Sequence, residues 1–457
     1  MKKNIIILVC LALFLQTNLF AQMQGYNSTE REFRYLQPNL NTIKVEKYND
    51  EEIITSCYSS NSLYSYFCKT TLGSSNVVYA QLPQRLEVFD FKICDDNVIM
   101  CGKRILPNAN IGFIAKIKVS DLFAGTGQLE IHEIQSERVV YKLECYSYNN
   151  SIRVAALSYD SHIYSFIDYD IGNLSTPYYK YSSDYTLYDI TQTNHYISIV
   201  FSERGANYFG IMRHDKANIS NNTGVIWSFP GYAHIYSTIE RRPENRETYF
   251  LIENIDNTDN VCIATEIEGA TGTFGAVDIG VYDIYLGNFT TNQSQLLLTA
   301  GKLKLKDIEY CDYNQALHII DNTDLVTSLN GVGTDIYSTD VIHEVKVYPN
   351  MFPYSTDVVL PNNNLMYGEY NNSIISYDDE YYIVAGLKNQ TNNLFWFDRK
   401  YTSGSTPTCY ARYKTTIKAT TINPINTYLY QSLSNQKTMT VESCNVSTGV
   451  LIIYCSD

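Results

Sequence analysis

The sequence predicts an all-β protein built from a repeated unit of short antiparallel strands. Short runs rich in Val, Ile, Tyr, Phe and Thr alternate with clusters of Asn, Asp, Gly and Ser, the pattern of half-buried strands joined by turns. The 457 residues are 45% hydrophobic and 13% aromatic, with 41 Tyr, a composition that excludes intrinsic disorder. Similar units recur along the chain, and such a repeat decides the architecture.

The first 21 residues are predicted to be a secretory signal peptide. Lys2 and Lys3 form its basic start, an apolar run extends from Ile5 to Leu15, and Ala21 marks the cleavage point. The run is shorter than the roughly 20 residues that span a bilayer, so we expect no transmembrane segment in the mature chain. The protein is expected outside the cytoplasm, in a periplasm, on an outer surface or in the medium.

Removal of Cys10 with this segment leaves ten of the 11 cysteines. An even number in an exported protein permits disulfides. Cys57 and Cys101 lie in apolar, strand-like runs, where small buried thiols are the simpler interpretation. No two cysteines have the C-x-x-C spacing of a zinc or redox site, so the sequence predicts neither and leaves the pairing open.

The clearest repeat unit covers residues 88–118. It comprises a strand that begins V-F-D-F, an Asp-Asp-Asn turn, a second strand, a polar loop and a third strand. The unit recurs at an offset of 99, where Tyr188–Ile190 aligns with Phe89–Phe91, and at an offset of 217, where the central aspartate is Asp307. A further copy begins at Ile374 with the same turn.

Identical pentapeptides I-D-N-T-D at Ile255–Asp259 and Ile320–Asp324 are expected to lie between the second and third strands of two units. Eight units fit the chain. Their first strands are expected to contain Ile43, Phe89, Leu143, Tyr188, Ile239, Ile308, Ile374 and Ile417. Their approximate bounds are 40–82, 86–135, 138–183, 185–230, 235–300, 303–349, 368–413 and 414–457.

Repeats of about 40 to 50 residues with four short strands resemble the β-propeller, in which four-stranded antiparallel blades pack around a central channel. The resemblance is to the architecture alone, since the chain has neither the Trp-Asp nor the double-glycine signature of named propeller families. It implies one domain over 22–457 with eight blades, seven being the alternative. Residues 22–40, with the strand-like E-F-R-Y-L, are expected to complete the last blade and latch the ring.

The charge and the acidic residues limit the ligands. With 34 Lys and Arg against 48 Asp and Glu, the net charge is -14, which excludes the basic surface that nucleic acids require. The aligned Asp90, Asp189 and Asp307 could ring a cation, but we expect them to tie the inner strands through hydrogen bonds to neighbouring amides. The turns Asp95–Asn97 and Asp378–Glu380 lack EF-hand spacing, so neither Ca²⁺ nor another cofactor is predicted.

No motif indicates a specific enzyme. The seven histidines are scattered singly, and there is neither a G-x-S-x-G elbow nor a Walker loop. The segment Gly269–Gly275 precedes strand-like residues instead of a helix, so it is interpreted as an insertion rather than a phosphate site. Trp227 and Trp396 lie in apolar strands and are expected in the core. Paired carboxylates for glycoside hydrolysis stay open, because only their separation in space identifies them.

The sequence therefore favours an exported, non-enzymatic binding module for a protein or glycan. Fold analogy places the ligand face in the loops between second and third strands and between blades. The expected contacts are Arg104, Arg204, Asp256, Asp259, Asp321 and Asp324. A glycoside hydrolase or polysaccharide lyase acting in the channel is the alternative, and it requires a pocket with opposed carboxylates, one of raised pKa. A structural envelope subunit is the third hypothesis, and its sign would be a large exposed apolar patch.

Overall fold

The structure is a computed structural model of the chain. It describes residues 30–34, 40–59, 61–71, 76–135, 137–161, 163–172, 177–182, 184–203, 208–228, 248, 250–255, 259–267, 281–288, 293–300, 302–311, 316–326, 336–346, 356–361, 370–376, 381–388, 392–399, 410–415, 418–422, 426–428 and 439–452. The expected signal peptide, 1–21, lies outside these residues. No helix among them is long and apolar enough to cross a membrane.

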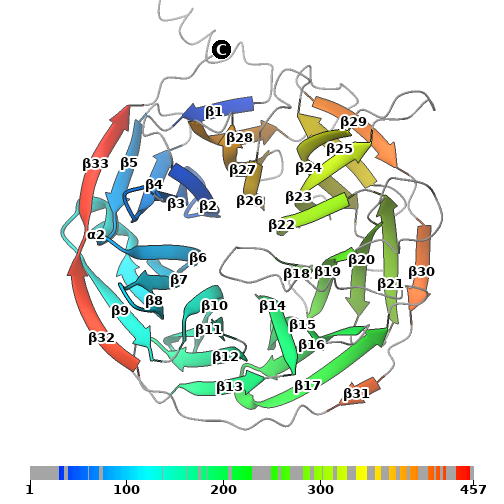
Figure 1. Cartoon of the computed structure of the whole chain (residues 1–457), viewed down its shortest axis with the longest axis horizontal. Helices are drawn as coiled ribbons and strands as arrows, with labels where there is room; N and C mark the ends of the chain where they lie inside the picture. The colour runs from blue at the N-terminus through cyan, green and yellow to red at the C-terminus, as the bar shows by residue number, and fades with distance from the viewer. Residues whose placement is uncertain are drawn as a thin grey trace, which may run out of the picture.

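The described residues form seven antiparallel sheets arranged around a central channel, so the protein is a β-propeller (Figure 1). In blades 1 to 6 the innermost strand comes first along the chain. Blades 1 and 2 comprise β2 (Leu40–Lys47), β3 (Glu52–Ser59), β4 (Tyr64–Thr71) and β5 (Asn76–Gln81), then β6 (Leu86–Cys94), β7 (Asn97–Ile105), β8 (Asn110–Lys118) and β9 (Gln128–Ile134). Blades 3 and 4 comprise β10 (Val139–Tyr148), β11 (Ser151–Asp160), β12 (Ile163–Asp170) and β13 (Tyr178–Ser182), then β14 (Tyr185–Gln192), β15 (Tyr196–Glu203), β16 (Tyr208–Asp215) and β17 (Asn218–Ser228).

The remaining blades continue in chain order. Blades 5 and 6 comprise β18 (Phe250–Ile255), β19 (Asn260–Ile267), β20 (Val281–Asn288) and β21 (Gln293–Ala300), then β22 (Lys302–Cys311), β23 (Ala316–Val326), β24 (Ile336–Lys346) and β25 (Thr356–Pro361). Blade 7 comprises β26 (Tyr370–Ser376), β27 (Tyr381–Lys388), β28 (Asn392–Arg399) and β1 (Glu30–Arg34). A short helix, α2 (Val119–Ala124), connects β8 to β9.

Blade 7 joins the two ends of the ring. Strand β1 pairs antiparallel with β28, with Glu30 opposite Asp398 and Arg34 opposite Leu394. Residues from the start of the chain thus supply the outer strand of the last blade, as the strand-like E-F-R-Y-L predicts. Closure of this kind leaves the first and last blades side by side without an edge between them.

The eighth blade expected over 414–457 is wrong for the described residues. The strands in this part of the chain each add to the outer edge of a different blade (Figure 1). We call them the C-terminal belt: β29 (Tyr410–Thr415) on blade 6, β30 (Lys418–Ile422) on blade 5, β31 (Asn426–Tyr428) on blade 4, β32 (Met439–Asn445) on blade 2 and β33 (Ser447–Ile452) on blade 1. Alternation marks a strand but not its partner, so the belt and a blade have the same sequence pattern.

The repeat register places six of the expected first-strand residues in innermost strands. They are Ile43, Phe89, Leu143, Tyr188, Ile308 and Ile374. Ile239 and Ile417 lie outside the described residues. The pentapeptides do not occupy equivalent places, because Ile255 ends the innermost strand β18 whereas Ile320–Asp324 lies inside β23. Their identity therefore does not mark a loop between second and third strands.

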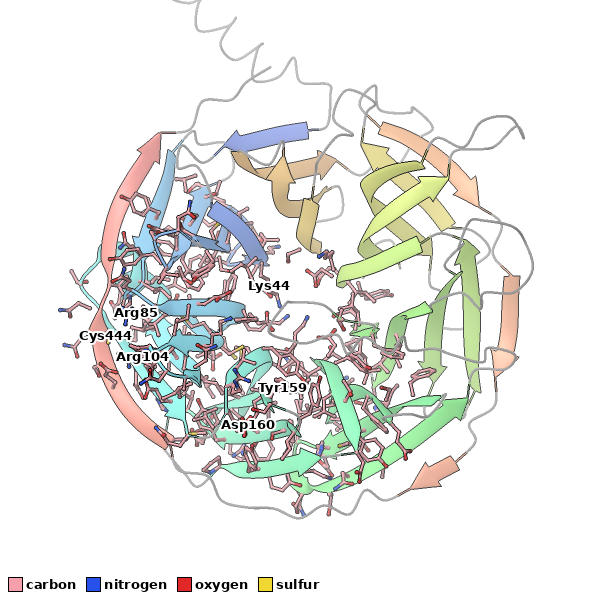
Figure 2. All side chains as sticks on the ribbon, viewed as in Figure 1. Lys44, Arg85, Arg104, Tyr159, Asp160 and Cys444 are labelled. Carbon is pink, nitrogen blue, oxygen red and sulfur yellow. The ribbon has the colours of Figure 1, made fainter. Side chains whose placement is uncertain are left out.

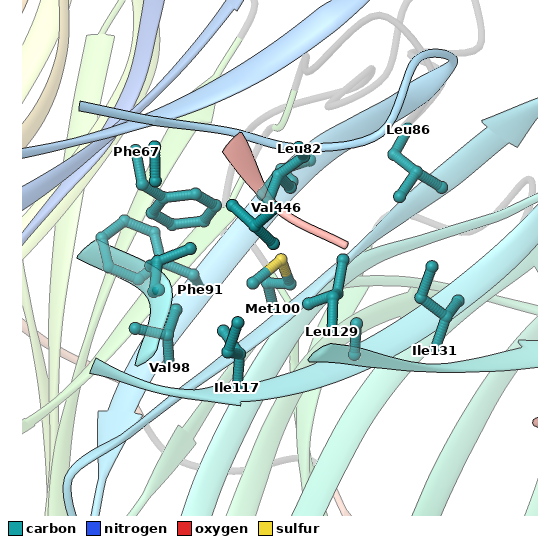
Figure 3. Packing of buried hydrophobic residues seen from close by; sticks show 14 of the residues in the cluster. Phe67, Leu82, Leu86, Phe91, Val98, Met100, Ile117, Leu129, Ile131 and Val446 are labelled. Atoms are coloured by element: carbon teal, nitrogen blue, oxygen red, sulfur yellow. The ribbon is translucent and has the colours of Figure 1, made fainter. Parts of the chain in front are cut away.

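The core consists of apolar layers between neighbouring blades. Between blades 1 and 2, Phe67 and Phe91 meet edge to face with ring centroids 5.1 Å apart, and Met100 and Leu129 pack beside them (Figure 3). Val446, in the belt between β32 and β33, joins the same cluster. The layers between blades 2 and 3 and between blades 3 and 4 are built in the same way. Blades 2 and 3 thus bury both of their faces.

Candidate functional site

The innermost strands carry a repeated irregularity that positions side chains at the channel. In six blades the pairing of the first two strands shifts by one residue, a β-bulge, and the shift comes directly before a polar residue. A bulge bends the strand and redirects its side chains. We call the residues after the shift the bulge tier: Lys44, Asp90, Lys142, Asp189, Asp307 and Ser373. Figure 2 shows Lys44 near the centre of the ring.

Ammonium and carboxylate groups of the bulge tier form pairs across blade boundaries. Lys44 Nζ lies 2.7 Å from Asp90 Oδ1, and Lys142 Nζ lies 3.1 Å from Asp189 Oδ1. Burial by itself would raise the pKa of Asp90, but Lys44, Lys142 and Lys92 hold that pKa below its usual value. Asp90 is therefore ionised at neutral pH and serves as an anion in the wall of the channel.

The aspartates also bind the backbone of the next blade. Asp90 Oδ2 accepts a hydrogen bond of 2.9 Å from the Leu143 amide, and Asp189 Oδ2 accepts one of 3.0 Å from the Ile252 amide. Asp90 Oδ1 accepts a local bond of 3.0 Å from the Phe91 amide. The expected structural role is confirmed for these two residues, and the bonds reach the neighbouring blade as well as the residue's own strand.

Asp307 and Ser373 continue this pattern to the ring closure. The Ser373 hydroxyl donates to Asp307 Oδ2 over 2.7 Å and accepts from the Val45 amide over 3.2 Å. Blades 6, 7 and 1 are thereby linked through one buried hydroxyl. The aspartates that the sequence repeat aligns thus link neighbouring blades through hydrogen bonds.

A second tier of charged residues lies two positions further along the innermost strands, on the same side of each strand because side chains alternate. It comprises Glu46, Lys92, Glu144, Glu253 and Glu309. Lys92 Nζ lies 3.3 Å from Glu46 Oε1 and 3.5 Å from Glu144 Oε1. Burial and the neighbouring carboxylate of Glu309 raise the pKa of Glu253 well above its usual value.

The two tiers enclose only a small cavity. Its volume is about 30 Å³, room for about two water molecules, whereas pockets for organic ligands measure roughly 300 Å³ or more. Among the described residues, no group of three or more His, Cys, Asp or Glu side chains is arranged to hold a metal ion. The channel at this depth admits water and small ions, and its charges stabilise the contact between blades.

The lysines of the channel are the residues that sequence reasoning missed. Lys44 and Lys142 each adjoin a residue expected in a first strand, Ile43 and Leu143. A charge at this position of an otherwise apolar strand, at the place where other units carry aspartate, was the available signal. Alignment on the aspartate alone hides it, because blades 1 to 4 alternate cation and anion at this position and do not repeat one residue.

Arg104 is not in a face loop. It lies in β7, on the rim, where its Nη1 contacts Glu133 Oε1 at 2.6 Å and pairs with Glu442 of the belt strand β32. Figure 2 shows it beside Cys444 at the outer edge of the ring. Both carboxylates raise the pKa of Arg104. The guanidinium therefore joins the belt to blade 2, and the loop between the second and third strands begins only after Ile105, the last residue of β7.

The expected contact aspartates do not converge on one site. Asp259, in the turn before β19, accepts bonds from Thr193 Oγ1 at 2.8 Å and from the His195 amide at 2.9 Å, and so joins blades 4 and 5. Asp321 and Asp324 lie inside β23, opposite Leu305 and Lys302. Arg204 and Asp256 lie outside the described residues.

The turn Asp95–Asn97 has the backbone of a tight hairpin. Asp95 and Asp96 have φ of 46° and 61°, as a type I′ turn requires at both central positions. Their carboxylates accept hydrogen bonds from Ser147 and Tyr48 at 2.7 and 2.6 Å. Both groups are thus engaged by neighbouring blades. The second expected turn, 378–380, lies outside the described residues.

Comparison with known proteins identifies similar structures but no family. No protein-family model matches the chain, and no curated protein matches it. A catalytically inactive virginiamycin B lyase from Staphylococcus aureus with quinupristin is 11% identical, with a TM-score of 0.41 over 81% of this chain and 98% of that one. The polysaccharide lyase Uly1 is 8% identical, with a TM-score of 0.42 over 81% and 99%. The WD40 domain of SCAP from fission yeast is 11% identical, with a TM-score of 0.39 over 81% and 98%.

Proposed function

We propose that the protein is an exported, non-enzymatic β-propeller that binds a protein or glycan through one face of its ring. One observation carries this proposal: the charges of the channel are engaged in contacts between blades around a cavity of about 30 Å³. A channel of this kind offers no room for an organic substrate. Recognition of a larger ligand therefore falls to the faces. Export rests on the N-terminal segment, with its basic start and apolar run.

The loops between second and third strands share a face with the loops between blades. The Arg85 amide, in the loop from blade 1 to blade 2, donates to Leu63 O over 2.7 Å, and the Ile105 amide donates to Arg85 O over 2.8 Å. Leu63 precedes β4, and Ile105 ends β7. On this face, which we call the loop face, backbone hydrogen bonds therefore join blades 1 and 2.

Arg85 is the described cation that best fits a contact on the loop face. Its side chain is exposed, and its backbone has φ of 71°, so the loop holds the arginine in one fixed place. Arg204 is the second proposed contact, because in the sequence it comes directly after Glu203, the last residue of β15. Exposed arginines are suited to carboxylates and sulfates, which they bind through two parallel hydrogen bonds.

The test is binding of the protein over 22–457 to a broad glycan array, with product analysis of the same glycans after long incubation. Retention without turnover, reduced at least tenfold by Arg85→Gln together with Arg204→Gln, would support the proposal. Lys118→Gln is the matched control, because exposed Lys118 ends β8 and lies on the opposite face. If no glycan binds, the search moves to a protein partner in envelope extracts. If the double variant binds glycans as well as the unaltered protein does, the loop face is not the binding surface.

Catalysis in the channel is the second candidate function. Glu253 favours it, because a partly buried carboxyl group with a raised pKa beside a second carboxylate, Glu309, is the arrangement of a general acid. Cleaved glycans that disappear with Glu253→Gln would promote this candidate. The third hypothesis, an envelope subunit with an apolar rim, has less support: the large hydrophobic side chains exposed among the described residues are Ile163 and Val441, and they lie on different sheets.

A further inference from the structure

The innermost strands of blades 2 and 3 run side by side and are joined at several levels. The Leu143 amide donates to Asp90 Oδ2 over 2.9 Å, and Lys92 Nζ lies 3.5 Å from Glu144 Oε1. Further along, Ser147 Oγ donates to Asp95 Oδ2 over 2.7 Å. These three contacts follow one another in the same order along β6 and β10. The residues between the second and the third contact must therefore also lie close together.

Two cysteines occupy that place. Cys94, the last residue of β6, lies between Lys92 and Asp95, and Cys145 of β10 lies between Glu144 and Ser147. Their thiols are hydrogen-bonded to each other. Cys145 is 5% exposed and belongs to the apolar layer between blades 2 and 3, against which the partly exposed Cys94 packs.

The other described cysteines have different surroundings. Cys57 pairs with Tyr66 and Cys68 with Thr55, so these two cysteines are diagonal neighbours on strands β3 and β4. Cys444 Sγ lies 3.6 Å from Glu442 Oε1 on the belt. Cys101 lies one strand further from the channel than Cys94, in β7. The interblade pair thus brings together two thiols from different blades.

We propose that Cys94 and Cys145 form a disulfide that joins blades 2 and 3. The oxidant is a disulfide of a small thiol or of an oxidoreductase. Cys94 thiolate attacks one sulfur of that disulfide, forms a mixed disulfide and releases the first thiol of the oxidant. Cys145 thiolate then attacks Cys94 Sγ and releases the second. The two cysteines lose two protons and two electrons, and the oxidant is reduced to two thiols.

The surroundings of the two thiols fit this order of reaction. The hydrogen bond from Cys145 lowers the pKa of Cys94, whereas the same bond and burial raise the pKa of Cys145. The thiolate is the nucleophile in disulfide exchange. The more exposed and more acidic Cys94 therefore reacts first with the oxidant, and the buried Cys145 reacts second without leaving its layer.

The bond would close a loop of 51 positions that contains most of blade 2. A cross-link over such a loop restricts the unfolded chain. We expect the oxidised protein to melt about 4 °C above the reduced protein. In the ring, the bond fixes one blade boundary at the end of the channel where the charged tiers stop.

Peptide mapping of the full chain tests the proposal. The protein is treated with oxidised glutathione, its remaining thiols are alkylated, and trypsin is added without reductant. Cleavage gives peptides 93–103 and 143–153, which we expect to be linked with a loss of two hydrogens. Because 93–103 also contains Cys101, a second cleavage before Asp95 separates Cys94 from Cys101. A link that stays on the fragment with Cys94 supports the proposal.

The melting temperature provides the second readout. Cys94→Ala and Cys145→Ala should each abolish the rise on oxidation, and Cys68→Ala is the control that should retain it. Cys94 and Cys145 both alkylated after oxidation would overturn the proposal, as would a link from either residue to another cysteine. If Cys145→Ala does not fold, mapping of the unaltered protein still decides the pairing.

Discussion

Ser373 Oγ accepts a hydrogen bond of 3.2 Å from the amide of Val45, although 328 positions separate the two residues. The same hydroxyl donates to Asp307 over 2.7 Å. One small side chain thus links the sixth, seventh and first blades at the place where the ring closes. Blade contacts here depend on polar groups of the backbone as well as on apolar layers.

Ser373→Ala is expected to weaken this closure. The substitution leaves the Val45 amide and an oxygen of Asp307 without the hydroxyl, and a buried polar group that loses its bond costs about 1–3 kcal/mol. The free energy of unfolding, measured in urea, should fall by that amount. Ser120→Ala, on the exposed side of α2, is the control and should change it by less than about 0.5 kcal/mol. Equal free energies of unfolding for the two variants would show that Ser373 does not stabilise the closure of the ring.

Lys44→Met should destabilise the ring strongly, because it leaves the carboxylate of Asp90 in the channel wall without the ammonium at 2.7 Å. Removal of one partner of a buried pair costs about 3–5 kcal/mol. Lys44→Met with Asp90→Asn should recover part of the loss, since no charge is then left unpaired. A double-mutant cycle in urea measures the recovery, and strictly additive losses would contradict the pair.

Acid should weaken the same contact. The lysines lower the pKa of Asp90 in the folded protein below its usual 3.8, so this carboxylate contributes stability at pH values above 3.8 that is lost as the pH falls through the folded pKa. The slope of the free energy of unfolding against pH, between about pH 4 and 2, should be shallower in Asp90→Asn. An unchanged slope would show that Asp90 is not held as an anion.

Glu253→Gln is expected to stabilise the protein at neutral pH. The pKa of Glu253 is raised in the folded state, so its contribution is greatest below the usual 4.5 and declines as the pH rises through the folded pKa. An amide cannot ionise, so the free energy of unfolding of the variant should exceed that of the unaltered protein at pH 7 and match it at pH 4. Glu51→Gln, at an exposed turn, serves as the control, and a loss at pH 7 would contradict this environment.

Arg104→Ala should loosen the belt without unfolding the ring. Its guanidinium contacts Glu133 of blade 2 and Glu442 of β32, and it is 28% exposed, so the cost in global stability should stay below about 1 kcal/mol. Hydrogen exchange should rise over 439–445 and stay unchanged in β3. Faster exchange throughout blade 2 would show instead that the arginine supports the blade itself.

The blades were predictable because each unit is local. The continuous buried runs around Phe89 and Tyr188 follow from burial on both sides of an innermost strand, and the aligned aspartates occupy a bulge that recurs in six of the seven blades. Sequence alone shows these features because they lie within a few residues of one another.

The belt and the site were not predictable in the same way. A strand added to an outer edge has the same alternation as a strand within a blade, so 414–457 reads as a further unit. Arg104 was assigned to a face loop because its strand continues through polar residues, Lys103 and Arg104, that bind carboxylates of the same sheet on β6 and β9. The meeting of Cys94 with Cys145 depends on how two blades pack, which spacing along the chain does not encode.

The belt also decides which backbone groups face the surroundings. An outer strand has a row of unpaired amides and carbonyls that can pair with another chain, and the belt occupies that row on blades 1, 2, 4, 5 and 6. A chain shortened before Tyr410 would uncover five such edges in one step. The last strands of this protein therefore protect the ring against self-association. We expect that loss of β33 alone, which uncovers the edge of blade 1, would already promote aggregation.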